Sequence, residues 1–198
     1  MRHGEEDVAK RLFIALPLPE TAKSEISAFV HALRRTAPEI RWVRPEQMHV
    51  TMKFLGDVEL EREKMLMGVL EPLSTMRPFQ FNLAGLGAFP DRRRARVVWT
   101  GIDLGKAEVT ELAGLVETAC EAAGFEREER GFSAHITLAR VKEPGDFGPL
   151  WRQADEIRFV GHPVHATEVR LIHSTLTPKG PVYRDLESFP LRGPNSQS

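Results

Sequence analysis

Apolar and polar residues alternate along the chain at two different periods, which predicts a mixture of strands and helices. Short runs of branched and aromatic apolar residues predict five strands in the first half of the chain, over residues 11–18, 40–43, 49–55, 79–89 and 95–102. Apolar residues three and four positions apart predict helices over residues 19–36 and 59–74, and Pro19 suits the first turn of the earlier one.

The second half of the chain repeats this order. A helix is expected over residues 105–123, ending near Gly124, and strands are expected over residues 132–141, 156–160, 166–174 and 182–189. At 198 residues the chain is long enough for one domain or two small lobes. We expect a single bilobal domain over residues 11–191, preceded by a flexible segment at 1–10 and followed by a disordered tail at 192–198.

One short motif occurs twice, 86 positions apart, as His49-Val50-Thr51-Met52 and as His135-Ile136-Thr137-Leu138. The same offset aligns other apolar positions of the two halves without a gap, namely Leu16 with Ile102, Ile26 with Leu112, Phe29 with Leu115, Val30 with Val116 and Val50 with Ile136. An internal repeat is therefore predicted. The expected fold class is α+β, with two antiparallel sheets backed by helices and related by a pseudo-two-fold axis.

Each copy of the motif presents an imidazole and a hydroxyl on the same face, because residues i and i+2 of a strand point the same way. If the two lobes face each other, His49, Thr51, His135 and Thr137 converge on one cleft. Displacement at phosphorus uses a base on the attacking oxygen and an acid on the departing oxygen, and two histidines can divide these tasks near neutral pH. The threonine hydroxyls can donate hydrogen bonds to the non-bridging oxygens.

Other interpretations of the motif stay open. A single His-x-Thr motif is more often the solvent-facing side of a half-buried strand. Only the presence of a second copy favours a functional site. A metal-dependent phosphohydrolase would need a third ligand, which His162, His165 or His173 could supply, but no HExxH, CxxC or acidic cluster accompanies them. A non-catalytic module that binds RNA or nucleotides is the alternative from another class.

Composition restricts the partners. Hydrophobic residues make up 41% of the chain, charged residues 28%, and the net charge is −1, so any nucleic-acid contact is expected to be local. Arg92, Arg93 and Arg94 lie between two predicted strands and form either a solvated loop or a phosphate contact.

The first residues do not resemble a secretory signal and no run is long enough to span a membrane, so we expect a cytoplasmic protein. The lone Cys120 is expected to be buried.

The sequence resembles the two-histidine (2H) phosphoesterase superfamily and, within it, the bacterial and archaeal RNA 2′,3′-cyclic phosphodiesterases, which are also described as 2′-5′ RNA ligases. The resemblance covers about residues 11–191 and rests on five stretches, "RLFIALPLP", "WVRPEQMHVTMKFLGDV", "RARVVW", "GFSAHITLAR" and "STLTPKGPVYRDL". It implies a bilobal α+β fold with His49, Thr51, His135 and Thr137 lining a central cleft.

The activity that the resemblance implies is hydrolysis of an RNA terminal 2′,3′-cyclic phosphate to a 2′-phosphomonoester, without a metal or other cofactor. Related enzymes suggest His135 as the base and His49 as the acid. Ligation of tRNA halves through a 2′-5′ bond is the reverse of phosphodiester cleavage and would be secondary in water. The expected partners are RNA ends or nucleoside 2′,3′-cyclic phosphates, with no obligatory protein partner and no membrane.

Further residues are weaker candidates. Arg140 lies three positions after Thr137, so a contact with the phosphate would need a bend or a bulge in the strand. Phe54 and Trp42 either stack on a base or pack in the core, with packing favoured for Trp42. Lys179 and Tyr183 either reach RNA or close a hairpin. The resemblance supports a phosphate contact for Arg140 in particular.

Overall fold

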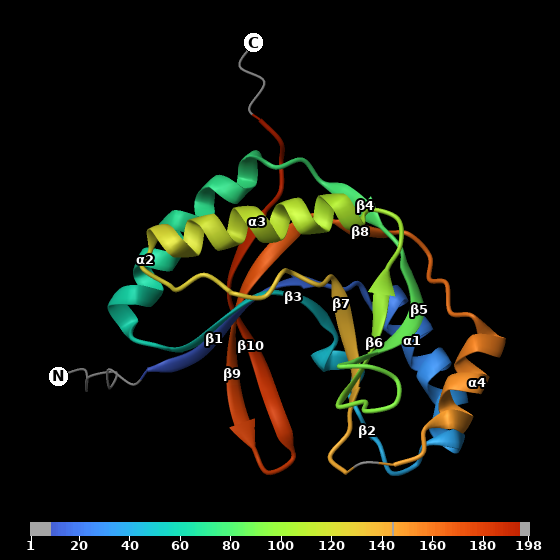
Figure 1. Cartoon of the computed structure of the whole chain (residues 1–198). Helices are drawn as coiled ribbons and strands as arrows, with labels where there is room; N and C mark the ends of the chain where they lie inside the picture. Colours follow the sequence, from blue (N-terminus) through green and yellow to red (C-terminus); the bar gives the residue numbers. More distant parts are fainter. Residues whose placement is uncertain (1–8, 144, 195–198) are drawn as a thin grey trace.

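An antiparallel sheet of eight strands occupies the centre of the computed structural model (Figure 1), which describes residues 9–143 and 145–194. Seven strands follow the order β10-β9-β1-β3-β7-β6-β5, and β2 pairs with β7 beside this path. A separate two-stranded sheet joins β4 to β8. The strands are β1 (Lys10–Pro17), β2 (Arg41–Trp42), β3 (His49–Val58), β4 (Phe79–Phe81), β5 (Leu83–Phe89), β6 (Val97–Ile102), β7 (His135–Arg140), β8 (Val164–Ala166), β9 (Glu168–Thr177) and β10 (Gly180–Pro190).

The large sheet consists of two half-sheets that meet between β3 and β7. The β3 half-sheet contains β10, β9, β1 and β3, whereas the β7 half-sheet contains β2, β7, β6 and β5. Of the described residues, only Val50 and Ile136 pair across the junction. The expected fold class, α+β with antiparallel sheets and a pseudo-two-fold arrangement, is therefore confirmed, with the two expected sheets joined along one short edge.

The helices lie in two pairs behind the half-sheets. Figure 1 shows α2 and α3 together over the β3 half-sheet, and α1 and α4 together beside the β7 half-sheet. Their bounds are α1 (Glu20–Leu33), α2 (Leu60–Leu70), α3 (Lys106–Ala122) and α4 (Gly148–Ile157), with short 3₁₀ helices η1 (Arg34–Thr36), η2 (Pro45–Gln47) and η3 (Glu71–Thr75). Each pair combines one helix from each half of the sequence, so a lobe is not a continuous half of the chain.

The offset of 86 residues also describes the arrangement of the elements. Moving β3 by 86 positions places its start at residue 135, where β7 begins, and the same shift moves Glu20 of α1 to Lys106 of α3. In the order β9-β1-β3-β7-β6-β5, equivalent strands lie at equal distances from the junction, with β1 matching β6 and β9 matching β5. The β3–β7 junction is therefore the position of the pseudo-two-fold axis.

Buried apolar residues fill the space between the sheet and the helices. The expected stripe of α1 is buried, since Ile26, Phe29, Val30 and Leu33 are almost inaccessible. Cys120 of α3 is buried too, and burial raises the pKa of its thiol to about 12, which makes it an inert core residue. A small separate cluster of Phe13, Ala15 and Ile172 lies on the opposite face of the β3 half-sheet.

Two expectations about secondary structure were wrong. Residues 156–160 do not form a strand, because α4 continues to Ile157 and buries Leu150, Trp151 and Ala154 on one helical face. Val160 makes only an isolated bridge with Ala84. The strand expected over 79–89 is divided at Asn82 into β4 and β5, which belong to different sheets.

Most other expected elements lie within a few residues of their predicted bounds, and Gly124 follows α3 with the positive φ of a helix-ending glycine. The flexible N-terminus and the disordered tail that we expected lie largely outside the described residues, at 1–8 and 195–198. Within the described part of the chain, no helix has the length and apolar character needed to cross a membrane.

Candidate active site

The two copies of the motif lie side by side on β3 and β7. Val50 is directly opposite Ile136 in an antiparallel pair, so continuing this register places His49 opposite Thr137 and Thr51 opposite His135. Val50 and Ile136 are fully buried, while the histidines and threonines are half-buried on the other face. The alternation predicted from the sequence therefore brings all four polar side chains to one face of the sheet.

A bulge follows the motif in each strand. In β3, Thr51 pairs with Ala15 and Lys53 with Ile14, so Met52 has no partner in β1. In β7, Thr137 pairs with Trp99 and Ala139 with Val98, so Leu138 has no partner in β6. An extra residue in a strand reverses the side on which later side chains point.

The bulges decide where Phe54 and Arg140 point. Without them, both side chains would lie on the face opposite to the preceding threonine, as the sequence pattern alone suggests. With them, both line the same cleft as the motifs. The structure thus contains the bulge that a phosphate contact from Arg140 requires.

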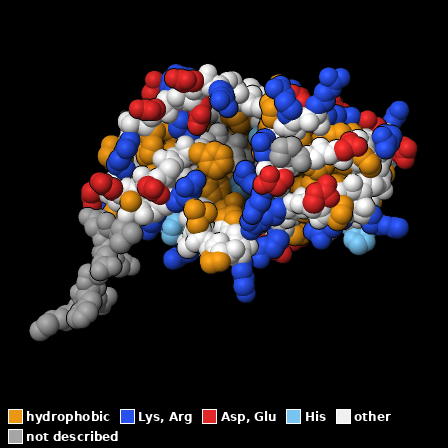
Figure 2. Space-filling view, turned by 60° about the horizontal axis from the view of Figure 1, so that its bottom comes forward, with side chains coloured by type: hydrophobic (Ala, Val, Ile, Leu, Met, Phe, Trp, Pro, Cys, Tyr) orange, Lys and Arg blue, Asp and Glu red, His pale blue; other side chains and the backbone are white. Residues whose placement is uncertain are grey.

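The cleft has a volume of about 340 Å³, which suits a nucleotide-sized ligand. Figure 2 views the molecule from the open side and shows apolar side chains within a hollow that basic side chains border. The residues that line the cleft are Arg41, Trp42, Val43, Gln47, His49, Thr51, Phe54, Phe89, Val97, His135, Thr137, Arg140, Pro181 and Tyr183.

The ring of His49 is held on three sides. Its Nδ1 donates to the carbonyl oxygen of Gln47 at 2.8 Å, and its ring centroid lies 4.8 Å from that of Phe13 and 5.5 Å from that of Tyr183. Burial lowers the pKa of His49 to about 4, against the opposing effect of the Gln47 carbonyl, and the positive charges of His135 and Arg140 add smaller effects in the same direction as burial. His49 is therefore neutral at pH 7, with the lone pair on Nε2.

His135 is held in the same way but less tightly. Its Nδ1 donates to the carbonyl oxygen of Ser133 at 2.7 Å, and Phe89 contacts the ring edge-on at 5.0 Å. Burial lowers its pKa as well, against the effect of the Ser133 carbonyl. Because a carbonyl can only accept, both rings are fixed in the tautomer that leaves Nε2 available for proton transfer.

The loop between β5 and β6 that contains Arg92, Arg93 and Arg94, which we call the arginine loop, does not reach the cleft. Arg92 makes two hydrogen bonds to Asp155 of α4, at 2.8 and 2.9 Å, and its guanidinium lies over the ring of Trp151. Arg94 pairs with Asp91 within the loop at 3.0 Å. Neither these two residues nor Arg93 line the cleft, so the structure does not bring the loop to the four motif residues.

Of the other candidate residues, some line the cleft and one does not. Tyr183 and Trp42 line the cleft, and Trp42 also donates to the carbonyl oxygen of Ala37 at 3.4 Å. Lys179 lies at the turn between β9 and β10, where its carbonyl oxygen accepts a bond from Arg41. Its side chain is not part of the cleft lining.

Sequence reasoning missed several residues of the cleft. Arg41, Gln47, Phe89 and Pro181 line it, yet none belongs to a repeated motif. One signal was available for Gln47, because it precedes His49 by two positions just as Ser133 precedes His135. Both supply the carbonyl that holds a histidine ring.

Of the described His, Cys, Asp and Glu side chains, only His49 and His135 line the cleft. In the described part of the chain, no group of three or more His, Cys, Asp or Glu side chains is arranged to hold a metal ion. Three histidines were considered as a third ligand, and none of them lines the cleft: His162 pairs with Glu25, His165 contacts Gln80, and His173 lies in β9.

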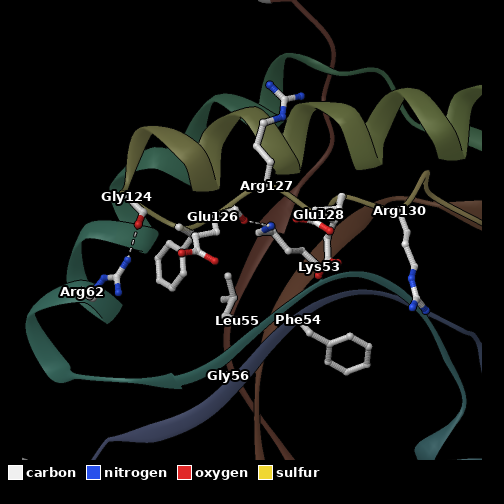
Figure 3. Close-up of a pocket in the computed structure, with 12 residues that line it drawn as sticks. Lys53, Phe54, Leu55, Gly56, Arg62, Gly124, Glu126, Arg127, Glu128 and Arg130 are labelled. Carbon is white, nitrogen blue, oxygen red and sulfur yellow. Dashed lines mark hydrogen bonds between the residues drawn. The ribbon is translucent and has the colours of Figure 1, made fainter.

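A second, larger hollow of about 750 Å³ adjoins the cleft at Phe54. It lies between β3 and the segment 124–130 that follows α3 (Figure 3). Lys53 crosses beneath this segment, with its ammonium 2.7 Å from Glu117 and 2.8 Å from the carbonyl oxygen of Glu126. We call this hollow the side groove.

Two pseudo-equivalent strands that present paired imidazoles and hydroxyls to one cleft define the class of two-histidine phosphoesterases. Comparison with protein families agrees, since the LigT-like phosphoesterase family matches residues 16–99 and 102–183. The chain belongs to this family.

Relatives and solved structures extend the similarity to most of the chain. The RNA 2′,3′-cyclic phosphodiesterase of Methanothermobacter thermautotrophicus is 33% identical over 183 residues, covering 91% of this chain and 98% of the relative. The enzyme of the same name from Archaeoglobus fulgidus is 34% identical over 182 residues, covering 90% and 99%.

Among solved structures, TT0787 of Thermus thermophilus superposes with a TM-score of 0.75 at 28% identity, covering 92% of this chain and 98% of that one. The E. coli LigT structure complexed with 3′-AMP gives a TM-score of 0.72 at 26% identity, with the same coverage. The family and the fold that the sequence predicted are thus confirmed.

Proposed function

We propose that this protein hydrolyses 2′,3′-cyclic phosphates at the ends of RNA to 2′-phosphomonoesters, using His49 and His135 and no metal. One observation carries the proposal: two imidazoles on neighbouring strands, each fixed through Nδ1 by a carbonyl, expose Nε2 to the same cleft. Several relatives named RNA 2′,3′-cyclic phosphodiesterase, similar over most of the chain, support the choice of substrate.

The mechanism divides proton transfer between the two rings. One imidazole, which is neutral, takes a proton from water as the water oxygen attacks phosphorus. The other imidazole, which is protonated, gives its proton to O3′ as the P–O3′ bond breaks. The hydroxyls of Thr51 and Thr137 donate to the non-bridging oxygens, and the guanidinium of Arg140 neutralises their growing charge. O2′ keeps the phosphate, which accounts for a 2′-phosphomonoester.

Burial affects both histidines in the same direction. It lowers the pKa of His49 to about 4 and also lowers the pKa of His135. The proposal therefore keeps the roles that the resemblance implies, with His135 as the base and His49 as the acid.

Phe54 is the side chain best placed to contact a base. It is 60% exposed although it is a large apolar residue, and it stands at the rim of the cleft. Exposed aromatic rings are the usual platforms for single-stranded nucleic acid. Tyr183 is more enclosed, and its edge-on contact with His49 suits a wall of the site.

The test is product analysis on a short RNA that ends in a 2′,3′-cyclic phosphate, in the presence of a chelator. We expect a 2′-phosphate end at an unchanged rate. A 3′-phosphate product would contradict the assigned bond cleavage. Loss of activity in chelator would favour a metal-dependent phosphohydrolase, and binding without turnover would favour a non-catalytic RNA-binding module.

A further inference from the structure

Three aromatic rings from neighbouring strands of the β7 half-sheet (Figure 1) pack against one another: His135 of β7, Trp99 of β6 and Phe89 of β5. The centroid of Phe89 lies 5.0 Å from that of His135 and 5.3 Å from that of Trp99. The indole lies 6.3 Å from the imidazole. These distances are typical of aromatic side chains in contact. We call this group the His135 ring cluster.

The ring of His49 is packed in a similar way, against Phe13 of β1 and Tyr183 of β10. These two neighbours also contact each other, with their centroids 5.0 Å apart. Each motif histidine thus has two aromatic neighbours in addition to the carbonyl that accepts from its Nδ1. A single hydrogen bond leaves an imidazole free to tilt, so the aromatic neighbours are needed to fix the direction of Nε2.

The two ring clusters do not use equivalent positions of the repeat. Trp99 pairs with Thr137 of the motif in β7. The corresponding partner of Thr51 in β3 is Ala15, which carries no ring. Tyr183 belongs to β10, a strand without a counterpart in the described part of the β7 half-sheet. The packing is therefore not a by-product of duplication, because each half reaches it with different side chains.

Gly87 provides the space in which the indole lies. It is the cross-strand partner of Trp99 in β5, and a Cβ atom added to it would lie 2.3 Å from both Cζ2 and Cη2 of the ring. A Cβ atom at Gly101 would lie 3.3 Å from Cζ3 of the same ring. The φ of Gly87 is not positive, so its backbone conformation does not require glycine. The close approach of the indole does.

The indole has an unfavourable feature at this position. Its N–H is buried and has no hydrogen-bond partner in the described part of the chain. A buried donor without a partner lowers stability. Phenylalanine would avoid this loss but would fill less of the space above Gly87. What Trp99 contributes is therefore the size of its ring.

We propose that Trp99 is a positioning residue for His135, and that residue 87 is glycine so that the indole can pack against the imidazole. Trp99 does not line the cleft, so it acts through His135 and Phe89, which do. The kinetic consequence rests on the proposed function. The orientation of the imidazole does not, since it is a property of the free protein.

The size of the effect follows from the geometry of proton transfer. Nε2 of His135 must lie within hydrogen-bond reach of the reacting oxygen, and the Ser133 carbonyl holds only the opposite side of the ring. A displacement of about 1 Å at a reacting group can cost about 100-fold in rate. Loss of the indole should therefore lower kcat more than it changes KM.

A double-mutant cycle between residues 87 and 99 tests the packing. Gly87→Ala should lower kcat for a nucleoside 2′,3′-cyclic phosphate by at least about tenfold, because the added methyl group displaces the indole. Trp99→Leu should lower kcat by about tenfold and leave KM within about threefold. In the Trp99→Leu background, Gly87→Ala should have less than about a twofold effect, because the methyl group then meets no ring.

The conservative variant Trp99→Phe keeps an aromatic ring and should retain more of kcat than Trp99→Leu. Equal losses from Gly87→Ala in both backgrounds would show that the strand itself requires glycine, and would overturn the role of residue 87. A folded Trp99→Leu protein with kcat within about twofold of the unmodified protein would overturn the positioning role.

Two variants control for loss of stability. Trp151→Leu removes a buried indole that donates to the carbonyl oxygen of Arg92 at 3.0 Å, outside the cleft. Gly114→Ala adds a methyl group in α3, where nothing lies within 4 Å. Both should leave kcat within about twofold, although Trp151→Leu should lower the melting temperature.

The ionisation of His135 gives a readout that needs no turnover. Burial lowers the pKa of this imidazole, and the indole supplies part of the burial. The charged groups that face it, Arg140 and His49, stay in place in Trp99→Leu. An NMR titration of this variant should therefore show the pKa of His135 rising toward 6.5, while that of His49 stays low.

An unchanged pKa of His135 in Trp99→Leu would overturn the proposal whatever the activity of the variant. If the unmodified protein hydrolyses no cyclic phosphate, the proposed function fails, and the titration still decides the role of Trp99. If Gly87→Ala does not fold, recovery of folding in the combined variant supports the packing of the indole on residue 87, and failure to recover contradicts it.

Discussion

Phe54 and Arg140 occupy equivalent positions in the two halves of the molecule, each directed into the cleft by a bulge two residues earlier. An apolar ring at one position and a guanidinium at the other make a symmetric floor chemically asymmetric. This difference suits a substrate with a base on one side and a charged phosphate on the other. Their substitutions should therefore affect different parts of the substrate.

For Arg140→Met, we expect kcat/KM to fall by about 100-fold on every substrate, because a charge partner of the transition state is lost. Phe54→Ala should raise KM for an RNA end by about tenfold and leave kcat nearly unchanged, since it removes a stacking contact. Steady-state kinetics on an oligonucleotide and on a nucleoside cyclic phosphate measures both. Equal effects of the two substitutions on all parameters would contradict this division.

The histidines should be the most sensitive positions. His49→Ala and His135→Ala should each lower kcat by at least about 100-fold, because each removes a partner in proton transfer. Thr51→Ala and Thr137→Ala should cost about 10- to 100-fold. Turnover close to that of the unmodified protein in either histidine variant, measured with a 2′,3′-cyclic nucleotide, would refute the mechanism.

The pH dependence should be a bell displaced toward acid. One imidazole must be neutral and the other protonated, so kcat/KM should rise with pH as one ring loses its proton and fall as the other does; burial lowers the pKa of both rings from 6.5, that of His49 to about 4. The optimum of kcat/KM should thus lie between about pH 4 and 6.5. In the complex, the phosphate anion stabilises the imidazolium, so the optimum of kcat should be more alkaline.

Profiles recorded from about pH 3.5 to 9 would check this expectation. His49→Ala and His135→Ala should each leave only one of the two limbs of the kcat/KM profile. An optimum of kcat/KM above about pH 7.5 would show that the proton needed for catalysis is not held by a buried imidazole.

Lys53 should matter for stability rather than for chemistry. Its buried ammonium pairs with Glu117, and the same carboxylate accepts the main-chain N–H of Glu128 at 3.0 Å. Lys53→Met would leave a largely buried carboxylate without its partner, at a cost of roughly 3–5 kcal/mol in the free energy of unfolding. Urea denaturation should show this loss, and adding Glu117→Leu should recover much of it. A single variant as stable as the unmodified protein would contradict the role of this pair.

Arg92 should contribute to the packing of its loop and not to catalysis. Its guanidinium is held by Asp155 and Trp151, outside the cleft. Arg92→Ala should therefore lower the melting temperature while kcat/KM for a nucleoside 2′,3′-cyclic phosphate stays within about twofold. A large loss of kcat/KM in a folded variant would restore the loop as a substrate contact.

Much of the fold followed from local pattern. The strands that carry the motifs, the stripe of α1 and the glycine after α3 could be predicted because periodicity and helix-ending signals depend on neighbouring residues. The strand expected at 156–160 failed for the same reason. Its short apolar alternation was outweighed by the packing of Leu150, Trp151 and Ala154, which only the assembled core makes favourable.

The sequence by itself determined the chemistry of the site: two histidines and two threonines, on one face of two equivalent strands. It determined this because alternation along a strand is fixed by backbone geometry and the offset of 86 residues is visible in the chain. The tertiary structure alone decided that Arg140 and Phe54 turn into the cleft, that the arginine loop turns away from it, and that Gln47 is bonded to the β9–β10 hairpin. Each of these depends on bulges or bonds between segments far apart in the chain, such as Gln47 and Pro181, which no local pattern encodes.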